Sequence, residues 1–85
     1  MTAPKLSKRA RLRYDAAESR WVLLWPERGV ILNDSASAIV RLCDGSRTVA
    51  QIVDQLASEW SAPRARVEHD VRTFLARIEA RGLLR

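Results

Sequence analysis

The sequence predicts a small α+β domain in which a three-stranded antiparallel sheet is followed by three helices. Two observations carry this prediction: every strand-like apolar run precedes residue 33, and every apolar run with helical periodicity follows it. The later helical runs are joined by short links, as in a helix-turn-helix, so we expect a winged helix-turn-helix-like arrangement. Eighty-five residues with 47% hydrophobic content fit one domain with a single core.

Three short segments have the pattern of strands. Apolar and charged residues alternate over Arg11–Asp15, which is typical of a half-buried strand. The segment Trp21–Trp25 is apolar throughout and indicates a central strand, covered by helices on one side and by large aromatic rings on the other. A turn cluster, Pro26–Gly29, precedes a third apolar run, Val30–Leu32. The three segments predict an antiparallel meander.

Trp21 and Trp25 lie on one face of the predicted central strand, on either side of Leu23. If that face points away from the helices, it forms an apolar patch that a monomer should not leave open. Tyr14 or the N-terminal segment could cover it, or a second copy could do so in a homodimer. The sequence leaves these alternatives open.

The first helix is predicted to begin after Asn33, whose side-chain oxygen can accept from the free N–H groups of a starting helix. Apolar residues recur at helical spacing over Ala36–Cys43. Gly45 is expected as the residue after the C-cap. Cys43 falls on the apolar face, where a cysteine behaves as a small hydrophobe.

Two further helices follow. Thr48 and Gln51 fit a capping box, and the apolar stripe after them predicts a helix ending near Trp60. The third helix is predicted from about Arg64 to Arg81. Gly82 ends it, and the two leucines that follow are expected to fold back as an apolar anchor.

The net charge of +5 is confined to the beginning of the chain. Five basic residues and no acidic residue occur in the first thirteen positions, whereas ten Arg are matched by ten Asp and Glu from Tyr14 onward. We therefore expect a flexible basic leader over residues 1–10 and one electrically balanced domain over residues 11–85. Because DNA binding usually needs a basic patch across the docking surface, this distribution weakens a nucleic-acid function. A winged-helix DNA-binding protein remains the alternative.

The composition gives little support to catalysis. Cys43 is the only cysteine, so neither an intramolecular disulfide nor a metal site built on several thiolates is expected. His69 is the only histidine and lies opposite the apolar stripe of its predicted helix. No phosphate loop, nucleophile elbow or metal-ligand spacing occurs. We expect a protein that is not an enzyme, has no cofactor, does not span a membrane and is cytoplasmic.

The third strand is expected at an edge of the sheet. An edge over Gly29–Leu32 would present unpaired backbone donors and acceptors, which an extended peptide could meet by adding a strand. Backbone bonds alone give little net affinity, so side-chain anchors on the third helix would be needed as well.

Four segments together resemble the PqqD family of pyrroloquinoline quinone (PQQ) biosynthesis. They are RLRYD, WVLLWPERGVILN, AIVRLCDGSRTVAQIV and DVRTFLARIEARGLL. The resemblance implies a winged-helix-like fold and a peptide chaperone, the prototype of the recognition elements for ribosomally made, post-translationally modified peptides (RiPPs). It also implies two partners, a PqqA-like precursor peptide carrying Glu and Tyr and a PqqE-like radical S-adenosylmethionine (SAM) enzyme.

In related recognition elements the peptide adds beside the third strand and against the third helix. Carried onto this chain, the resemblance implies these peptide-binding residues: Gly29, Val30, Ile31, Leu32, Val67, Asp70, Val71, Phe74 and Arg77.

Overall fold

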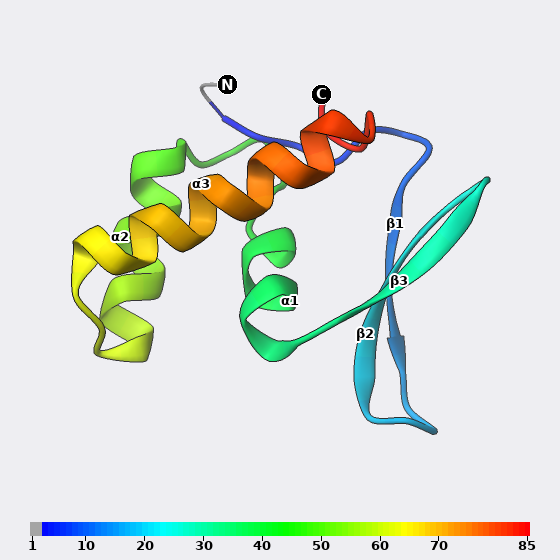
Figure 1. The fold of residues 1–85 in the computed structure, drawn as a ribbon, viewed down its shortest axis with the longest axis horizontal. Coiled ribbons are helices and arrows are strands. Elements are labelled where there is room, and N and C mark those ends of the chain that lie inside the picture. Colours follow the sequence, from blue (N-terminus) through cyan, green and yellow to red (C-terminus); the bar gives the residue numbers. More distant parts are fainter. Residues whose placement is uncertain (1–2) are drawn as a thin grey trace.

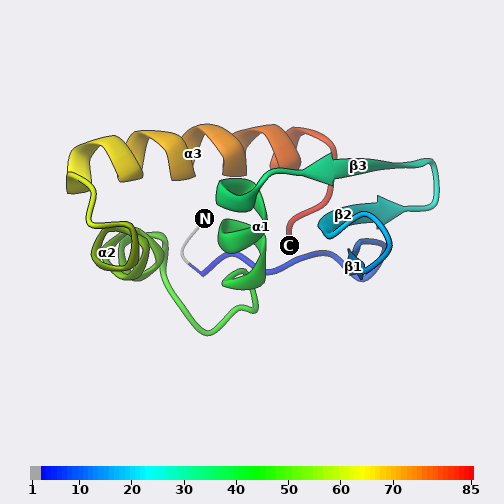
Figure 2. The same ribbon diagram turned by 90° about the horizontal axis from the view of Figure 1, so that it is seen from below.

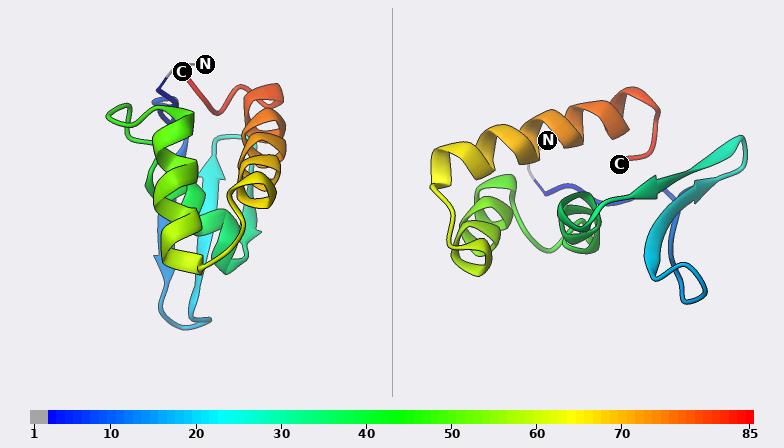
Figure 3. Two further views of the ribbon diagram at one scale, coloured as in Figure 1. Left: turned by 90° about the vertical axis from the view of Figure 1, so that its left-hand side faces the viewer. Right: turned by 60° about the horizontal axis from the view of Figure 1, so that its bottom comes forward.

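A computed structural model describes residues 3–85. Its elements in chain order are β1 (Arg11–Asp15), β2 (Arg20–Trp25), β3 (Arg28–Leu32), α1 (Asp34–Arg41), α2 (Val49–Trp60) and α3 (Arg64–Ala80). The strands form one antiparallel sheet in the order β1-β2-β3, and the three helices lie to one side of it (Figures 1 and 3). The predicted fold class, three antiparallel strands followed by three helices, is confirmed.

The sheet is a meander in continuous register. Leu12 of β1 lies opposite Leu23 of β2, which in turn lies opposite Val30 of β3. Two residues, Pro26 and Glu27, connect β2 to β3. Because side chains alternate between the faces of a strand, these three aliphatic residues share the face that packs against the core.

Both indoles of β2 lie on this same face. Leu23 is fully buried, and Trp21 and Trp25 pack half-buried against the core. Tyr14 meets Trp21 edge to face with ring centroids 5.2 Å apart, and the Arg41 guanidinium lies 5.3 Å from the Trp21 ring centre. The expectation of aromatic rings on the face away from the helices was wrong. Residues two apart in a strand share a face. Because Leu23 faces the core, Trp21 and Trp25 must face the core as well.

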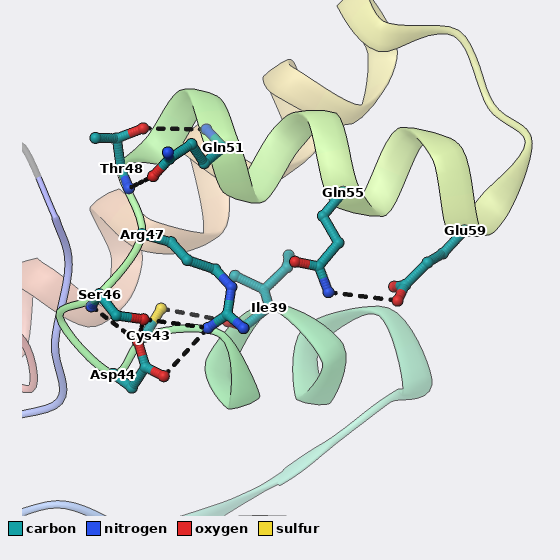
Figure 4. Close-up of polar contacts among 9 residues, drawn as sticks. All are labelled: Ile39, Cys43, Asp44, Ser46, Arg47, Thr48, Gln51, Gln55 and Glu59. Carbon is teal, nitrogen blue, oxygen red and sulfur yellow. Dashed lines mark hydrogen bonds and ion pairs between the residues drawn. The ribbon is translucent and has the colours of Figure 1, made fainter.

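The helices begin where the capping residues predict. Asn33 Oδ1 accepts a hydrogen bond from the Ala36 N–H at 2.8 Å. At the start of α2 the Thr48 N–H donates to Gln51 Oε1 at 2.8 Å, and the Gln51 N–H donates to Thr48 Oγ1 at 3.1 Å (Figure 4). This reciprocal capping box satisfies donors that a helix start leaves free.

One helix end differs from the prediction. Helix α1 ends before Gly45, with Leu42 as its C-cap residue donating to the Ile39 carbonyl. Gly45 has a φ of 84° but lies in the connection to α2, so its expected place directly after the C-cap was wrong. Gly82, with a φ of 72°, does follow the C-cap of α3 as predicted.

A single hydrophobic core joins the sheet to the helical layer. Its buried members are Leu23, Leu32, Ile39, Val40, Cys43, Val49, Ile52, Val53, Leu56, Val67, Val71, Leu75, Ile78 and Leu83. Leu83 is fully buried, which confirms the apolar anchor expected after α3. No helix in residues 3–85 is long and apolar enough to cross a membrane.

Residues 3–10, which we call the N-terminal strap, run between two distant parts of the chain. Pro4 is fully buried, and isolated bridges pair Lys5 with Asp44 and Leu6 with Leu84. Four backbone hydrogen bonds hold the strap, from Gly45 N–H to Pro4 O, Leu6 N–H to Cys43 O, Ser7 N–H to Leu83 O and Arg85 N–H to Lys5 O.

The strap occupies most of the segment that we expected to be a flexible leader over residues 1–10. The described part instead packs against the body of the protein. Two apolar side chains, Pro4 and Leu6, contribute to this packing, which a prediction based on the charge count overlooked. Residues 1 and 2 lie outside the described range.

Candidate functional site

The outer edge of β3 has free backbone groups. In an antiparallel ladder, hydrogen-bonded pairs alternate with non-hydrogen-bonded pairs. The pair Trp25 and Arg28 closes a two-residue turn, so it is a hydrogen-bonded pair. Gly29 and Ile31 fall in the alternate pairs, and their N–H and C=O groups therefore point away from β2. Because β3 is the last strand in the sheet order, these four groups face the open edge.

A groove runs between this edge and α3. Its first hollow has a volume of about 270 Å³ and is lined by Val30, Ile31, Leu32, Asn33, Ala36, Phe74, Arg77, Ile78 and Arg81. A second hollow, of about 340 Å³, continues toward the start of α3 and shares four of these residues, Asn33, Ala36, Phe74 and Arg77. Figure 2 shows β3 beside the C-terminal end of α3. We call the two hollows together the β3–α3 groove.

The two ends of the groove differ in charge. Phe74 is half-buried and lines both hollows, so it forms an apolar centre. Arg81 lines the first hollow only, whereas Arg77 lines both hollows; both arginines are exposed and form no ion pair within residues 3–85. Asp70 and His69 line the second hollow. The groove can therefore distinguish the two directions of a charged, extended ligand.

The opposite flank of α3 is occupied by ion pairs. Glu68 accepts from Arg72 at 2.9 Å and from Arg64 at 3.2 Å. These contacts, Arg72 foremost, lower the pKa of the Glu68 carboxyl. Arg64 also pairs with Asp54 of α2 at 2.6 Å, which ties the start of α3 to its neighbouring helix. Arg77 and Arg81, on the groove flank, have no such partners in the described part of the chain, so they remain available to a ligand.

The structure brings most of the implied peptide-binding residues together. Five of them line the first hollow: Val30, Ile31, Leu32, Phe74 and Arg77. Asp70 lines the second hollow, and Gly29 lies on the open edge outside both. Val67 and Val71 are only 2% and 0% exposed and belong to the core, so they are not available for direct contact with a peptide. They lie on the face of α3 that packs inward.

Sequence reasoning missed several groove residues. Asn33 and Ala36 line both hollows, and Ile78 lines the first. Ile78 could have been found, because residues four apart lie on one side of a helix and Ile78 follows Phe74 by four positions. The first two required the tertiary structure, since they belong to the start of α1 and not to β3 or α3.

The junction between α1 and α2 is structural. Cys43 Sγ donates to the Ile39 carbonyl at 3.3 Å, and burial, with a smaller contribution from Asp44, raises the pKa of Cys43 to about 12. The thiol therefore stays protonated at neutral pH and is a poor nucleophile. Next to it, the Ser46 hydroxyl and N–H and then Arg47 lower the pKa of Asp44 (Figure 4).

Comparisons with known proteins place the chain in a family. Residues 20–84 match the family described as coenzyme PQQ synthesis protein D (PqqD). A "PqqA binding protein" of Rhodopseudomonas palustris strain BisB5 is 43% identical over 81 residues, which cover 95% of this chain and 79% of the relative.

Two solved structures have similar folds. The solution NMR structure of the PqqD truncation of Methylobacterium extorquens PqqCD has a TM-score of 0.82 and 38% identity, and the match covers 96% of this chain and 87% of that one. It is described as a functional, stand-alone RiPP recognition element. TbiB1 in complex with the TbiA(β) leader peptide has a TM-score of 0.81 and 28% identity, covering 94% and 93% of the two chains.

The resemblance noted in the sequence is thus confirmed over most of the chain. With the three-strand, three-helix fold and the open β3 edge, these matches establish that this chain belongs to the PqqD family.

Proposed function

We propose that this protein is a peptide chaperone of PQQ biosynthesis, which binds a ribosomally made precursor peptide in the β3–α3 groove and presents it to a radical SAM enzyme. The observation that carries this proposal is the open edge of β3 beside a groove on α3. Membership of the PqqD family supports it, as do the name "PqqA binding protein" of a close relative and the bound leader peptide of TbiB1.

The peptide binds as an added strand in this proposal. The N–H and C=O groups of Gly29 and Ile31 pair with it, and each bond contributes only about 0.5–1.5 kcal/mol net. An apolar side chain of the peptide packs on Phe74, and this anchor adds the affinity that the backbone lacks. Arg81, with Arg77 near the centre, attracts a carboxylate at one end of the groove, while Asp70 disfavours one at the other. The charges therefore select one direction of the peptide.

The role proposed for the chain is positioning and not catalysis. A protein that holds the peptide and docks on the enzyme raises the effective concentration of the reacting segment at the enzyme. The single thiol, Cys43, is protonated and packed in the core and has no part in this role. A cytoplasmic location fits the proposal, because a ribosomally made peptide is available there before any export.

The test is a titration of the ¹⁵N-labelled protein with synthetic PqqA peptide of the same organism, monitored by amide chemical shifts. Shifts are expected at Gly29–Leu32 and along the groove flank of α3 from Asp70 to Arg81. A scrambled peptide of the same composition is the control. Shifts that miss both β3 and α3, or equal shifts with the scrambled peptide, would contradict the proposal.

The DNA-binding alternative is tested in parallel with duplex DNA at low and moderate salt. Binding through phosphates would weaken steeply as the salt concentration rises. We expect no such binding, because α3 carries paired carboxylates on one flank and Asp70 on the other. Tight, salt-sensitive binding would favour the alternative.

A further inference from the structure

The face of the sheet that points away from the helices has an apolar centre. Val22 lies directly opposite Ile31 in the register, and Leu24 lies opposite Gly29. Ile31 is 55% exposed, which is unusual for an isoleucine. A Cβ atom built on Gly29 would lie 2.5 Å from Leu24 Cδ2, so the Leu24 side chain lies across the glycine. We call Val22, Leu24 and Ile31 the outer patch.

A basic row borders the outer patch. Arg11 lies opposite Leu24 and Arg13 opposite Val22, on the same face. Both arginines are exposed and form no ion pair within residues 3–85. Arg13, Val22 and Leu24 line a shallow hollow of about 480 Å³ together with Tyr14, Asp15 and Ala16, so one carboxylate lies at its end. The surface therefore suits a partner that presents carboxylates beside an apolar contact.

Ile31 connects this face to the proposed peptide site. Its backbone N–H and C=O point to the open edge, whereas its side chain points to the outer patch. A peptide that adds beside β3 must alternate in the same way. Half of its side chains enter the β3–α3 groove, and the other half extend the outer patch beyond Ile31. The complete outer surface therefore exists only when the peptide is bound.

We propose that the outer patch, with Arg11 and Arg13, is the surface on which the peptide-modifying enzyme docks, and that the outward side chains of the bound peptide form part of the same contact. This inference rests on the proposed function. It identifies the surface of this protein that contacts the enzyme. It also implies that the complementary site on the enzyme has an apolar contact beside acidic side chains. A symmetric pair of copies fits less well, because it would bring the unpaired arginines of both copies to one contact.

The first experiment measures affinity for the purified radical SAM enzyme in the presence of saturating PqqA peptide. Arg13→Glu is compared with Arg72→Glu, which makes the same charge change at an exposed position on the far flank of α3. Val22→Ser removes apolar surface from the outer patch at a residue that lines neither hollow of the β3–α3 groove. Arg13→Glu and Val22→Ser are expected to weaken enzyme binding by about tenfold. Arg72→Glu is expected to change it by less than about twofold.

Peptide affinity without the enzyme separates the two proposals. All three variants are expected to bind PqqA peptide as the original protein does. If peptide binding is intact and the enzyme binds every variant equally, the docking surface is wrong while the proposed function stands. If the original protein binds no PqqA peptide, the proposed function itself fails. If sedimentation detects a homodimer and Val22→Ser dissociates it, the patch belongs to a second copy and the inference is overturned.

The peptide offers a second, independent test. Alanine substitutions along PqqA should alternate in effect over the segment that pairs with β3. Substitutions of side chains that enter the β3–α3 groove should weaken binding to this protein. Substitutions of the intervening, outward side chains should weaken only the assembly with the enzyme. If affinity for the enzyme does not alternate along the peptide in this way, the bound peptide is not part of the docking surface.

Discussion

Two places in this molecule can hold an extended segment between other elements, and they differ in what fills them. The N-terminal strap is held by backbone hydrogen bonds on two sides, and Pro4 is fully buried. The β3–α3 groove has an open strand edge on one side and α3 on the other, and no segment of residues 3–85 pairs with that edge. The strap shows that a bound extended segment here uses apolar anchors in addition to backbone bonds. A peptide in the groove needs the same combination.

The largest effect is expected from removing the support under the strap. Leu83 is fully buried and its carbonyl accepts from the Ser7 N–H at 2.8 Å. Leu83→Ala should lower the free energy of unfolding by about 2–4 kcal/mol, because it leaves a cavity in the core. Urea denaturation measures the change. Leu84→Ala, at the half-buried position beside it, is the control and should lower the free energy of unfolding by less. An equal decrease for both variants would contradict the role of Leu83 as the main apolar anchor.

The next largest effect is expected from removing a backbone donor at the open edge of β3. Ile31→Pro removes an N–H that faces the edge, so PqqA peptide affinity should fall by about tenfold or more. The free energy of unfolding should fall by about 1 kcal/mol or less, since proline is tolerated at an outward-facing edge position. Isothermal calorimetry and denaturation measure the two quantities.

Val30→Pro is the matched control for the edge. Val30 is in a hydrogen-bonded pair with Leu23, so proline there breaks a bond to β2 and should destabilise the sheet clearly. If Ile31→Pro destabilised the protein as much as Val30→Pro does, the N–H of Ile31 would not be free.

A smaller effect is expected at the apolar centre of the groove. Phe74→Ala should weaken PqqA peptide binding by about three- to tenfold, because the peptide loses its aromatic anchor. Phe74→Leu keeps apolar volume and should recover part of the affinity. Calorimetry with both variants checks this order; unchanged affinity in Phe74→Ala would remove Phe74 from the site.

The smallest effect is a pH dependence at the connection between α1 and α2, next to the strap. The backbone of Asp44 forms an isolated β-bridge with Lys5 of the strap. Its carboxylate instead accepts from Ser46 and Arg47, and the pKa of the carboxyl is lowered, mainly by the Ser46 hydroxyl. A lowered carboxyl pKa stabilises the fold above the unfolded-state pKa of about 3.9, and this stabilisation is lost as the pH falls through the folded-state value. The stability difference between the original protein and Asp44→Asn should therefore shrink from pH 6 to pH 3.

Denaturation at both pH values measures this difference. Glu79→Gln, at an exposed position outside any ion pair within residues 3–85, is the control. A difference for Asp44→Asn that does not change with pH would show that the carboxylate contributes nothing to stability through Ser46 and Arg47.

The sequence by itself determined the local features of this protein. Alternation, turn residues and capping side chains such as Asn33 and Thr48 act over a few positions, so they predicted the strands, the helix starts and their order correctly. The family resemblance added the peptide site, and Phe74 and Arg77 do line the groove beside β3.

Only the tertiary structure decided which face each element buries and what distant segments meet. The rotation of α3 against the core buries Val67 and Val71 and leaves Phe74 in the groove, although all three lie on one apolar stripe. The strap depends on contacts between residues about forty and eighty positions apart. Such contacts arise from packing of the whole chain, because burial of apolar surface is shared among elements and is not encoded within any one of them.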